Sequence, residues 1–219
     1  LDLTKVADLG ADYSAYGIKA NNKTTIVVDS NKTNPGKNGT ITIKAKTLWS
    51  PSGDSGSKYT AAHGIAVGNF SQRFNKKVSE DLVKTTINAD VVIEELRGGS
   101  IKTTGISSMD CSDLAINGRF TIKPGAISLM QWNRGDQSKT YGIYMIGSNN
   151  TISITSADID DSKNGSLSDL IKTDESLWGG KTEKNVLRIG GGTLKVKENQ
   201  KGRYLISAAK GFRTFINVN

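Results

Sequence analysis

Short stretches of alternating apolar and polar residues recur along the whole chain. They are clearest at 25–29, 39–44, 151–155 and 192–197, where Ile, Leu or Val alternates with Thr, Ser or Lys. Alternation with a period of two is the pattern of a β-strand that buries one face. The nearest helical candidates, 77–84 and 167–178, are short and polar. The pattern therefore predicts an all-β chain whose strands are about five residues long.

A tripeptide X-Gly-Ile recurs between these strands. It begins at Tyr16, His63, Thr104 and Tyr141, so its glycines lie 47, 41 and 37 residues apart. A short polar break and then an alternating strand follow each copy. Two solenoid turns of about 20 residues each, with loops of variable length, would produce an irregular period near 40. The whole chain would then make roughly ten turns and rise roughly 45–50 Å.

Asparagine and glycine separate the strands, for example at Asn117-Gly118 and Asn149-Asn150. Asn-Gly is also a strong hairpin signal, so a β-sandwich or barrel is the alternative fold. In a solenoid, Asn tolerates the left-handed conformation of a bend and can hydrogen-bond the Asn of the next turn, while Gly relieves tight corners. The X-Gly-Ile repeat favours the solenoid.

In the solenoid interpretation, the apolar member of each alternating pair faces one continuous core. The expected inward residues are Ile41, Ile43, Ile152, Ile154, Leu194 and Val196. The polar residues between them face outward, including Ser153, Lys195 and Lys197.

Composition adds limits to this picture. The 219 residues carry 29 Lys+Arg against 21 Asp+Glu, a net charge of +8, and are 36% hydrophobic. These values exclude a disordered chain and a helical membrane bundle. We treat 1–219 as a single β-helix domain. The chain opens at Leu1 without Met and shows no signal peptide, so we expect a fragment of a longer protein or a processed chain.

The chain has one cysteine, Cys111, and one histidine, His63. An intrachain disulfide and a Cys/His metal site are therefore excluded, and we expect no metal and no cofactor. His63 stands where Tyr16 and Tyr141 stand in other repeats, so we interpret it as a structural corner residue. Cys111 is expected to be a small buried or half-buried thiol.

The Gly-Ile units, each followed by an Asn-rich bend and a Thr-Ile-Thr-Ile type of strand, resemble the passenger region of a type V autotransporter. The stretches 120–129 and 187–194 share the likeness, which spans roughly residues 16–196. The resemblance implies a right-handed parallel β-helix displayed on a bacterial surface. It also implies anchoring in the outer membrane by a C-terminal barrel that this sequence does not contain. The near absence of Cys suits a protein that crosses the periplasm before it folds.

Parallel β-helices also serve as polysaccharide lyases and hydrolases, which need carboxylates that converge on one face. The best cluster is Asp158, Asp160 and Asp161. Asp158 and Asp160 share a face if the segment is extended. They lead into a turn-rich stretch, so we interpret the cluster as a solvated loop and expect no catalytic residue.

Two features suggest binding. The first is a set of expected loops at 48–61, 70–81 and 162–183, in or beside which lie Trp49, Phe70, Phe74 and Trp178. These aromatic residues either recognise a partner or pin each loop to the coil wall. An Arg-Gly-Asp motif at 134–136 is a further hypothesis for an adhesive contact.

The second feature is the basic segment 184–213, which holds eight basic residues and one acid. Its candidate ligand-binding residues are Lys195, Lys197, Lys201 and Arg203. No recognition helix, zinc finger or stacking motif accompanies them, so nucleic acid is not the expected partner. An anionic glycan fits an extracellular solenoid better, and a solvated edge that discourages end-to-end stacking is the alternative.

Together these features predict a bacterial surface adhesin without enzymatic activity. Its expected partners are a host-surface protein, an anionic glycan or another copy of itself. Two alternatives remain: a secreted or phage-borne polysaccharide lyase or hydrolase, and a structural stalk that holds a distal module away from the cell.

Overall fold

The computed structural model of the chain describes residues 2–3, 15–21, 24–29, 39–46, 61–69, 82–98, 102–129, 139–163, 166–174, 185–197 and 203–208. The strands are β1 (Asp2–Leu3), β2 (Ala15–Ala20), β3 (Thr25–Asp29), β4 (Thr40–Lys46), β5 (Ala62–Gly68), β6 (Val83–Asn88), β7 (Asp90–Gly98), β8 (Lys102–Met109), β9 (Ser112–Ile122), β10 (Ile127–Leu129), β11 (Lys139–Ile146), β12 (Thr151–Asp160), β13 (Asp169–Asp174), β14 (Val186–Ile189), β15 (Gly192–Lys195) and β16 (Tyr204–Ser207). Among these residues, no helix has the length and apolar character needed to cross a bilayer. The prediction of an all-β chain is confirmed.

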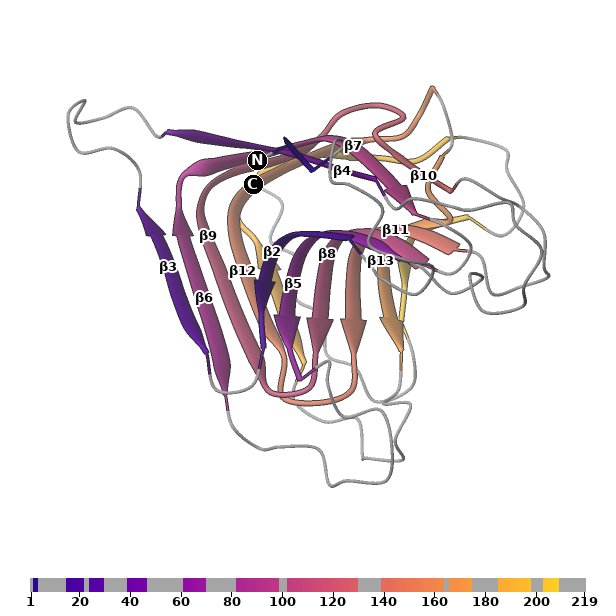
Figure 1. The fold of residues 1–219 in the computed structure, drawn as a ribbon. Coiled ribbons are helices and arrows are strands. Elements are labelled where there is room, and N and C mark those ends of the chain that lie inside the picture. Colours follow the sequence, from indigo (N-terminus) through magenta and orange to yellow (C-terminus); the bar gives the residue numbers. More distant parts are fainter. Residues whose placement is uncertain are drawn as a thin grey trace, which may run out of the picture.

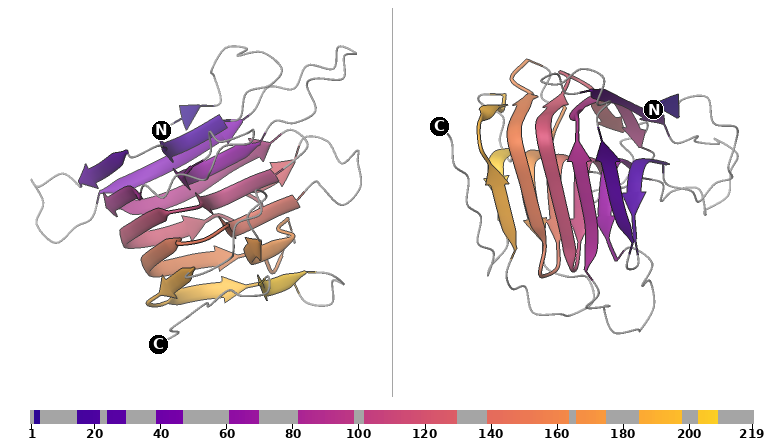
Figure 2. Two further views of the ribbon diagram at one scale, coloured as in Figure 1. Left: turned by 90° about the horizontal axis from the view of Figure 1, so that it is seen from below. Right: turned by 90° about the vertical axis from the view of Figure 1, so that its left-hand side faces the viewer.

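The strands form two sheets that lie on either side of one core (Figure 1). The six-stranded sheet has the order β16-β13-β11-β8-β5-β2, and the ten-stranded sheet contains the other strands. Figure 2 shows that the strands of each sheet are stacked in chain order, from the indigo N-terminal strands to the yellow C-terminal ones. Each pass of the chain thus adds one strand to the six-stranded sheet and one or two strands to the ten-stranded sheet.

Strand pairing is parallel throughout both sheets, which rules out the hairpin alternative. Asn117-Gly118 is not a turn between antiparallel strands, because it lies inside β9. The strand pairs with β6 before this point and with β7 after it. The asparagine and glycine therefore mark a change of direction within one long strand.

The X-Gly-Ile repeats stack directly on one another in the six-stranded sheet. Tyr16 pairs with His63, His63 with Thr104, and Thr104 with Tyr141. Asp169 and then Tyr204 continue the same row. The period of 37–47 residues thus separates adjacent strands of this sheet. The expected spacing of about 20 residues between successive turns was wrong, because one pass of the chain also builds the longer path through the ten-stranded sheet.

The predicted inward register is confirmed. Ile43 and Ile152 have no exposed surface and Ile154 has 3%. Ile41, Leu194 and Val196 are half-buried and pack against the same core. Isoleucines also form a continuous row across the six-stranded sheet, at 18, 65, 106, 143 and 171. Stacking like on like buries each isoleucine against its neighbours along the whole core.

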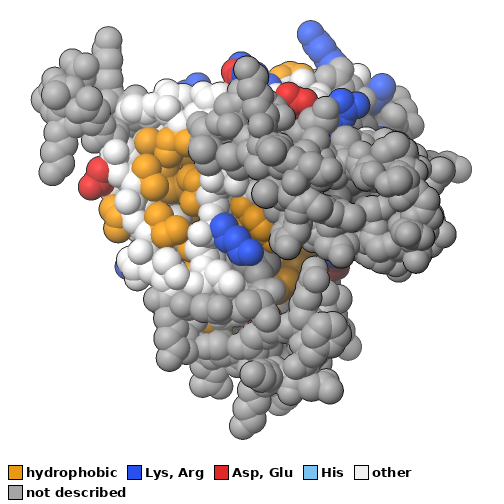
Figure 3. Space-filling model, in the orientation of Figure 1, with side chains coloured by type: hydrophobic (Ala, Val, Ile, Leu, Met, Phe, Trp, Pro, Cys, Tyr) orange, Lys and Arg blue, Asp and Glu red, His pale blue; other side chains and the backbone are white. Residues whose placement is uncertain are grey.

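The core reaches the surface at the N-terminal end of the stack, which faces the viewer in Figure 3. Orange hydrophobic side chains are visible there. Ile18 on β2, and Ile26 and Val28 on β3, are only half-buried, and both strands lie at the edge of their sheet. An end strand has a neighbour on one side only, so its inward side chains are less completely covered than those in the middle of the stack.

The glycine of the repeat is explained by the close approach of two backbones. A Cβ atom at Gly105 would lie 2.7 Å from the carbonyl oxygen of Gly142 and 2.7 Å from Cδ1 of Ile122 in the facing sheet. Gly17 and Gly64 show the same crowding. Only glycine fits at this position, because the next strand and the opposite sheet both occupy the space of a side chain.

Asparagines stabilise the bends as expected. Asn149 adopts a left-handed conformation with φ of 58°. On the ten-stranded sheet, Nδ2 of Asn117 donates to Oδ1 of Asn88 at 2.6 Å, and Nδ2 of Asn88 donates to Oδ1 of Asp29 at 2.6 Å. This amide ladder connects three successive strands at the same bend.

Candidate binding surface on the C-terminal strands

The predicted basic residues lie at the C-terminal edge of the two sheets. Lys195 ends β15 and is exposed, with its Nζ 3.9 Å from Oδ2 of Asp160. Lys197 follows β15 and is half-buried. Arg203 precedes β16 and has only 22% of its side chain exposed. Its Nη1 donates to the carbonyl oxygen of Leu167 at 3.0 Å. Lys195 and Arg203 thus already have partners within the protein.

The other predicted ligand-binding residues, Lys201, Trp49, Phe74 and Trp178, lie outside the described residues. The same is true of Phe70 and of the Arg-Gly-Asp motif.

Two of the three carboxylates in the acidic cluster lie on a strand and not in a solvated loop, which corrects the earlier interpretation of these two residues. Asp158 and Asp160 lie on β12, and alternation places them on one face. Asp158 lies 3.3 Å from Nη1 of Arg119 and accepts a hydrogen bond from the backbone N–H of Thr193. The segment was misjudged because its turn residues begin only after the strand has ended.

The hydrogen bonds of this cluster disfavour acid–base chemistry. Asp160 accepts hydrogen bonds from both the backbone N–H and the hydroxyl of Ser162, and these bonds lower the pKa of its carboxyl. Asp161 is buried and accepts from Ser166 and from the backbone N–H of Leu167. A general acid needs a raised pKa, whereas Asp160 is held ionised. The cluster fits a role in pairing neighbouring strands.

His63 and Cys111 also have structural surroundings. His63 lies within β5, directly before the repeat glycine Gly64. Its ring stacks on Tyr16 with centroids 5.3 Å apart, and Nδ1 is 2.7 Å from Oγ1 of Thr104. Burial, aided by Lys19 and Lys102, lowers the pKa of His63 to about 4. Cys111 is buried, as predicted.

A polar network that sequence reasoning missed joins three strands of the six-stranded sheet. Nζ of Lys102 donates to the hydroxyl of Tyr144 at 2.7 Å, and that hydroxyl donates to Oδ2 of Asp174 at 2.8 Å. Lys172 lies 3.2 Å from Oδ1 of the same carboxylate. Burial raises the pKa of Tyr144 and lowers that of Lys102, so the phenol stays neutral. The groups satisfy one another and tie β8, β11 and β13 together.

The network forms because the Gly-Ile step interrupts the alternation of the strand. Ile143 and Met145 belong to the main core, whereas Tyr141, Tyr144 and Ile146 form a separate cluster. Strict alternation would place residues 141 and 144 on opposite faces. The Tyr-Gly-Ile-Tyr sequence contains the signal, but the signal can be interpreted only when the break in alternation at the glycine is known.

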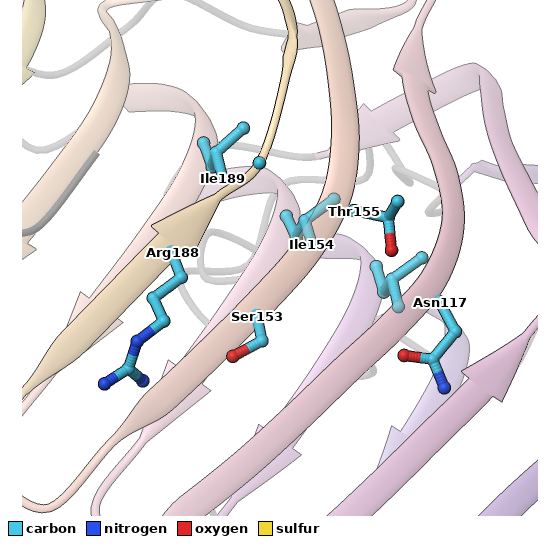
Figure 4. A pocket seen from close by; sticks show the side chains of 8 residues that line it. Asn117, Ser153, Ile154, Thr155, Arg188 and Ile189 are labelled. Carbon is cyan, nitrogen blue, oxygen red and sulfur yellow. The ribbon is translucent and has the colours of Figure 1, made fainter. Parts of the chain in front are cut away.

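A shallow pocket of about 280 Å³ lies on the ten-stranded sheet, where β9, β12 and β14 run side by side (Figure 4). Its polar lining consists of Asn117, Ser153, Thr155 and Arg188. Arg188 is exposed and pairs in register with Ser153. The pocket therefore combines one cation with neutral hydrogen-bonding groups. Sequence reasoning counted Arg188 in the basic segment but had no means of placing it beside Asn117.

Across the described residues, no group of three or more His, Cys, Asp or Glu side chains gathers as a metal site would require. No protein-family model matches this chain, and comparisons with curated proteins and with solved structures return no match. The geometry of the chain itself therefore carries the functional argument.

Proposed function

We propose that this chain is a right-handed parallel β-helix from the passenger region of a bacterial autotransporter, and that it acts as an adhesin for anionic glycans. The supporting architecture is the stack of in-register parallel strands in two sheets. Connections between parallel strands of one sheet are almost always right-handed, which supports the proposed hand. The six strands of the smaller sheet suggest about six coils in the described residues, rather than ten.

The observation that carries the binding function is the uneven charge of the last strands. Residues 185–197 and 203–208, which include β14, β15 and β16, contain four basic side chains and no acidic one. Arg188 and Lys195 are exposed. A cluster of one charge on a rigid surface raises the local concentration of an oppositely charged ligand.

Ion pairs within the protein reduce the number of basic side chains that are available to a ligand. Nζ of Lys195 lies 3.9 Å from Oδ2 of Asp160, and Nη1 of Arg203 lies 3.8 Å from Oδ2 of Asp161. Exposed ion pairs are weak, typically under about 1 kcal/mol, so a polyanion can replace Asp160 as the partner of Lys195. Arg203 is more firmly held, because it also donates to a backbone carbonyl. We therefore assign the binding surface to Arg188, Lys195 and Lys197, with Arg203 as its support.

The test is retention of the 219-residue chain on a heparin column at low and at physiological salt. The wild type should be retained at low salt and should elute earlier as salt rises, because exposed charges are screened within about 8 Å at physiological ionic strength. Replacing Lys195 and Lys197 with Ala should weaken retention more than replacing Lys19 and Lys84, which are exposed but lie on β2 and β6. Equal retention of the two double variants would refute this surface as the binding site.

Adhesion itself can be tested with beads coated with the chain and added to cultured epithelial cells. Adherence that falls when soluble heparin is added, and that is weaker for the Lys195/Lys197 double variant, would support the adhesin function. Adherence that soluble polyanion leaves unchanged would exclude glycan binding as its cause.

A further inference from the structure

The pocket on the ten-stranded sheet exists because the amide ladder stops. Asn88 and Asn117 occupy the bend on β6 and β9 and are hydrogen-bonded to each other. Ile116 pairs with Ile154 and Ile154 with Ile189, so the next positions along the bend are Thr155 and Gly190. These residues are smaller than asparagine, and the surface is hollowed where the amide side chains end.

The groups around this hollow are complementary to an anionic sugar. Arg188 is the one charged residue in the pocket lining. In Figure 4 the hydroxyl of Ser153 points to the side on which the Arg188 guanidinium lies, and the amide oxygen of Asn117 points toward Ser153. Since Nδ2 of Asn117 donates to Asn88, its Oδ1 is the atom suited to accept a hydrogen bond in the pocket.

We propose that this pocket binds one acidic sugar unit of a glycan through its carboxylate or sulfate. This inference rests on the proposed function and identifies a subsite for it. The guanidinium of Arg188 binds the oxyanion, helped by the hydroxyl of Ser153. Asn117 and Thr155 bind hydroxyl groups of the sugar ring.

The chemistry of each group fits this assignment. Arginine presents a planar fork of donors that matches carboxylate and sulfate oxygens, and it is always charged. A serine hydroxyl adds a donor, and an amide oxygen accepts from a sugar hydroxyl. The volume of about 280 Å³ lies just below the range of pockets for drug-sized ligands, which suits a single sugar unit.

The pocket also offers a matched set of variants. Ser153→Asp places a negative charge beside Arg188, whereas Thr86→Asp places the same charge two strands away on the same row, since Thr86 pairs with Ala115 and Ala115 with Ser153. Arg188→Ala removes the pocket cation, and Lys84→Ala removes an exposed cation of the same sheet outside the pocket.

The experiment measures affinity of the 219-residue chain for three fluorescent oligosaccharides: trigalacturonate, a chondroitin sulfate tetrasaccharide and neutral maltotriose. Wild type should bind the two anionic probes and not maltotriose. Arg188→Ala and Ser153→Asp should each weaken binding about tenfold, the loss expected for one charge-assisted hydrogen-bonding group. Thr86→Asp and Lys84→Ala should change it less than about twofold. Circular dichroism should be the same for all variants.

The possible outcomes distinguish the pocket proposal from the proposed adhesin function. Binding of trigalacturonate would show that a carboxylate is sufficient. Binding of the chondroitin sulfate tetrasaccharide alone, which carries both carboxylates and sulfates, would show that the site requires sulfate. Equal losses for Arg188→Ala and Lys84→Ala would mean diffuse charge attraction and would overturn the pocket, while leaving the adhesin function supported if heparin retention persists. Absence of binding to both anionic probes would overturn the pocket alone when heparin retains the chain, and would overturn both proposals when it does not.

Discussion

The close approach at the repeat glycine leads to a quantitative prediction for Gly105→Ala. The new Cβ would lie 2.7 Å from the carbonyl oxygen of Gly142 and 2.7 Å from Cδ1 of Ile122, against an ordinary contact distance of at least 3.4 Å. The carbonyl belongs to the neighbouring strand β11 and cannot withdraw without disturbing its pairing with β8. Overpacking of this kind costs about 1–3 kcal/mol of unfolding free energy.

Gly191→Ala is the matched control, because a Cβ at that position meets no atom within 4 Å. It should leave stability unchanged or raise it by up to about 1 kcal/mol, since alanine reduces the entropy of the unfolded chain. The assay is urea unfolding followed by circular dichroism. The unfolding free energy in water is compared among wild type and both variants, and an unchanged slope of free energy against urea shows that the comparison is valid. In thermal unfolding, Gly105→Ala should lower Tm by about 2–4 °C for each kcal/mol lost.

The reasoning would be refuted by a Gly105→Ala variant as stable as wild type, because alanine would then fit where the two backbones are supposed to exclude it. It would be refuted equally by a Gly191→Ala variant that loses as much stability as Gly105→Ala. In that case the loss would reflect removal of glycine in general rather than the space at the repeat position.

Three further predictions follow from the register, the polar network and the buried histidine. Ile152→Asp should lose several kcal/mol of unfolding free energy because it buries an unpaired charge, whereas Ser153→Asp should be nearly silent; equal losses in urea unfolding would contradict the register. Tyr144→Phe should lower the unfolding free energy by about 1–3 kcal/mol, because the Tyr144 hydroxyl joins a partly buried ammonium to a carboxylate. The control Tyr204→Phe, at a residue that is 56% exposed, should change the unfolding free energy little. If Tyr144→Phe is as stable as wild type, the polar network does not stabilise the fold. Burial lowers the pKa of His63 to about 4, so the stability gained from the neutral imidazole is complete above about pH 6.5 and is lost as pH falls through 4, by about 3 kcal/mol in total. His63→Gln should flatten that part of the curve of stability against pH. An unchanged curve would contradict the lowered pKa of His63.

The strands and their inward faces could be predicted from the amino-acid sequence alone. Alternation is a local property with a period of two, so Ile43, Ile152 and Ile154 could be placed in the core without knowledge of their partners. The X-Gly-Ile repeat likewise predicted parallel stacking, because residues in corresponding positions of a solenoid pair in register. The buried state of Cys111 followed from its residue type.

Pairing between residues far apart in the chain depends on how the coils stack, and alternation does not predict it. The number of residues per pass depends on how far the chain travels through the second sheet, which alternation does not encode. The same holds for the candidate site: the salt bridges of Asp158 and Asp160 involve side chains from neighbouring strands, at Arg119 and Lys195. Their charges could be counted in the sequence, but their partners could not.

The pocket and the polar network could not be predicted from the sequence for the same physical reason. Asn117 and Arg188 are 71 positions apart in the chain, yet they line one hollow because parallel stacking brings three strands to the same bend. Tyr144 meets Lys102 because the alternation of the strand is broken at a glycine that the packing of the two sheets requires. The alternation of a strand depends on neighbours along the chain and can therefore be recognised in the sequence. A binding surface depends on neighbours across strands and forms only when the coils stack.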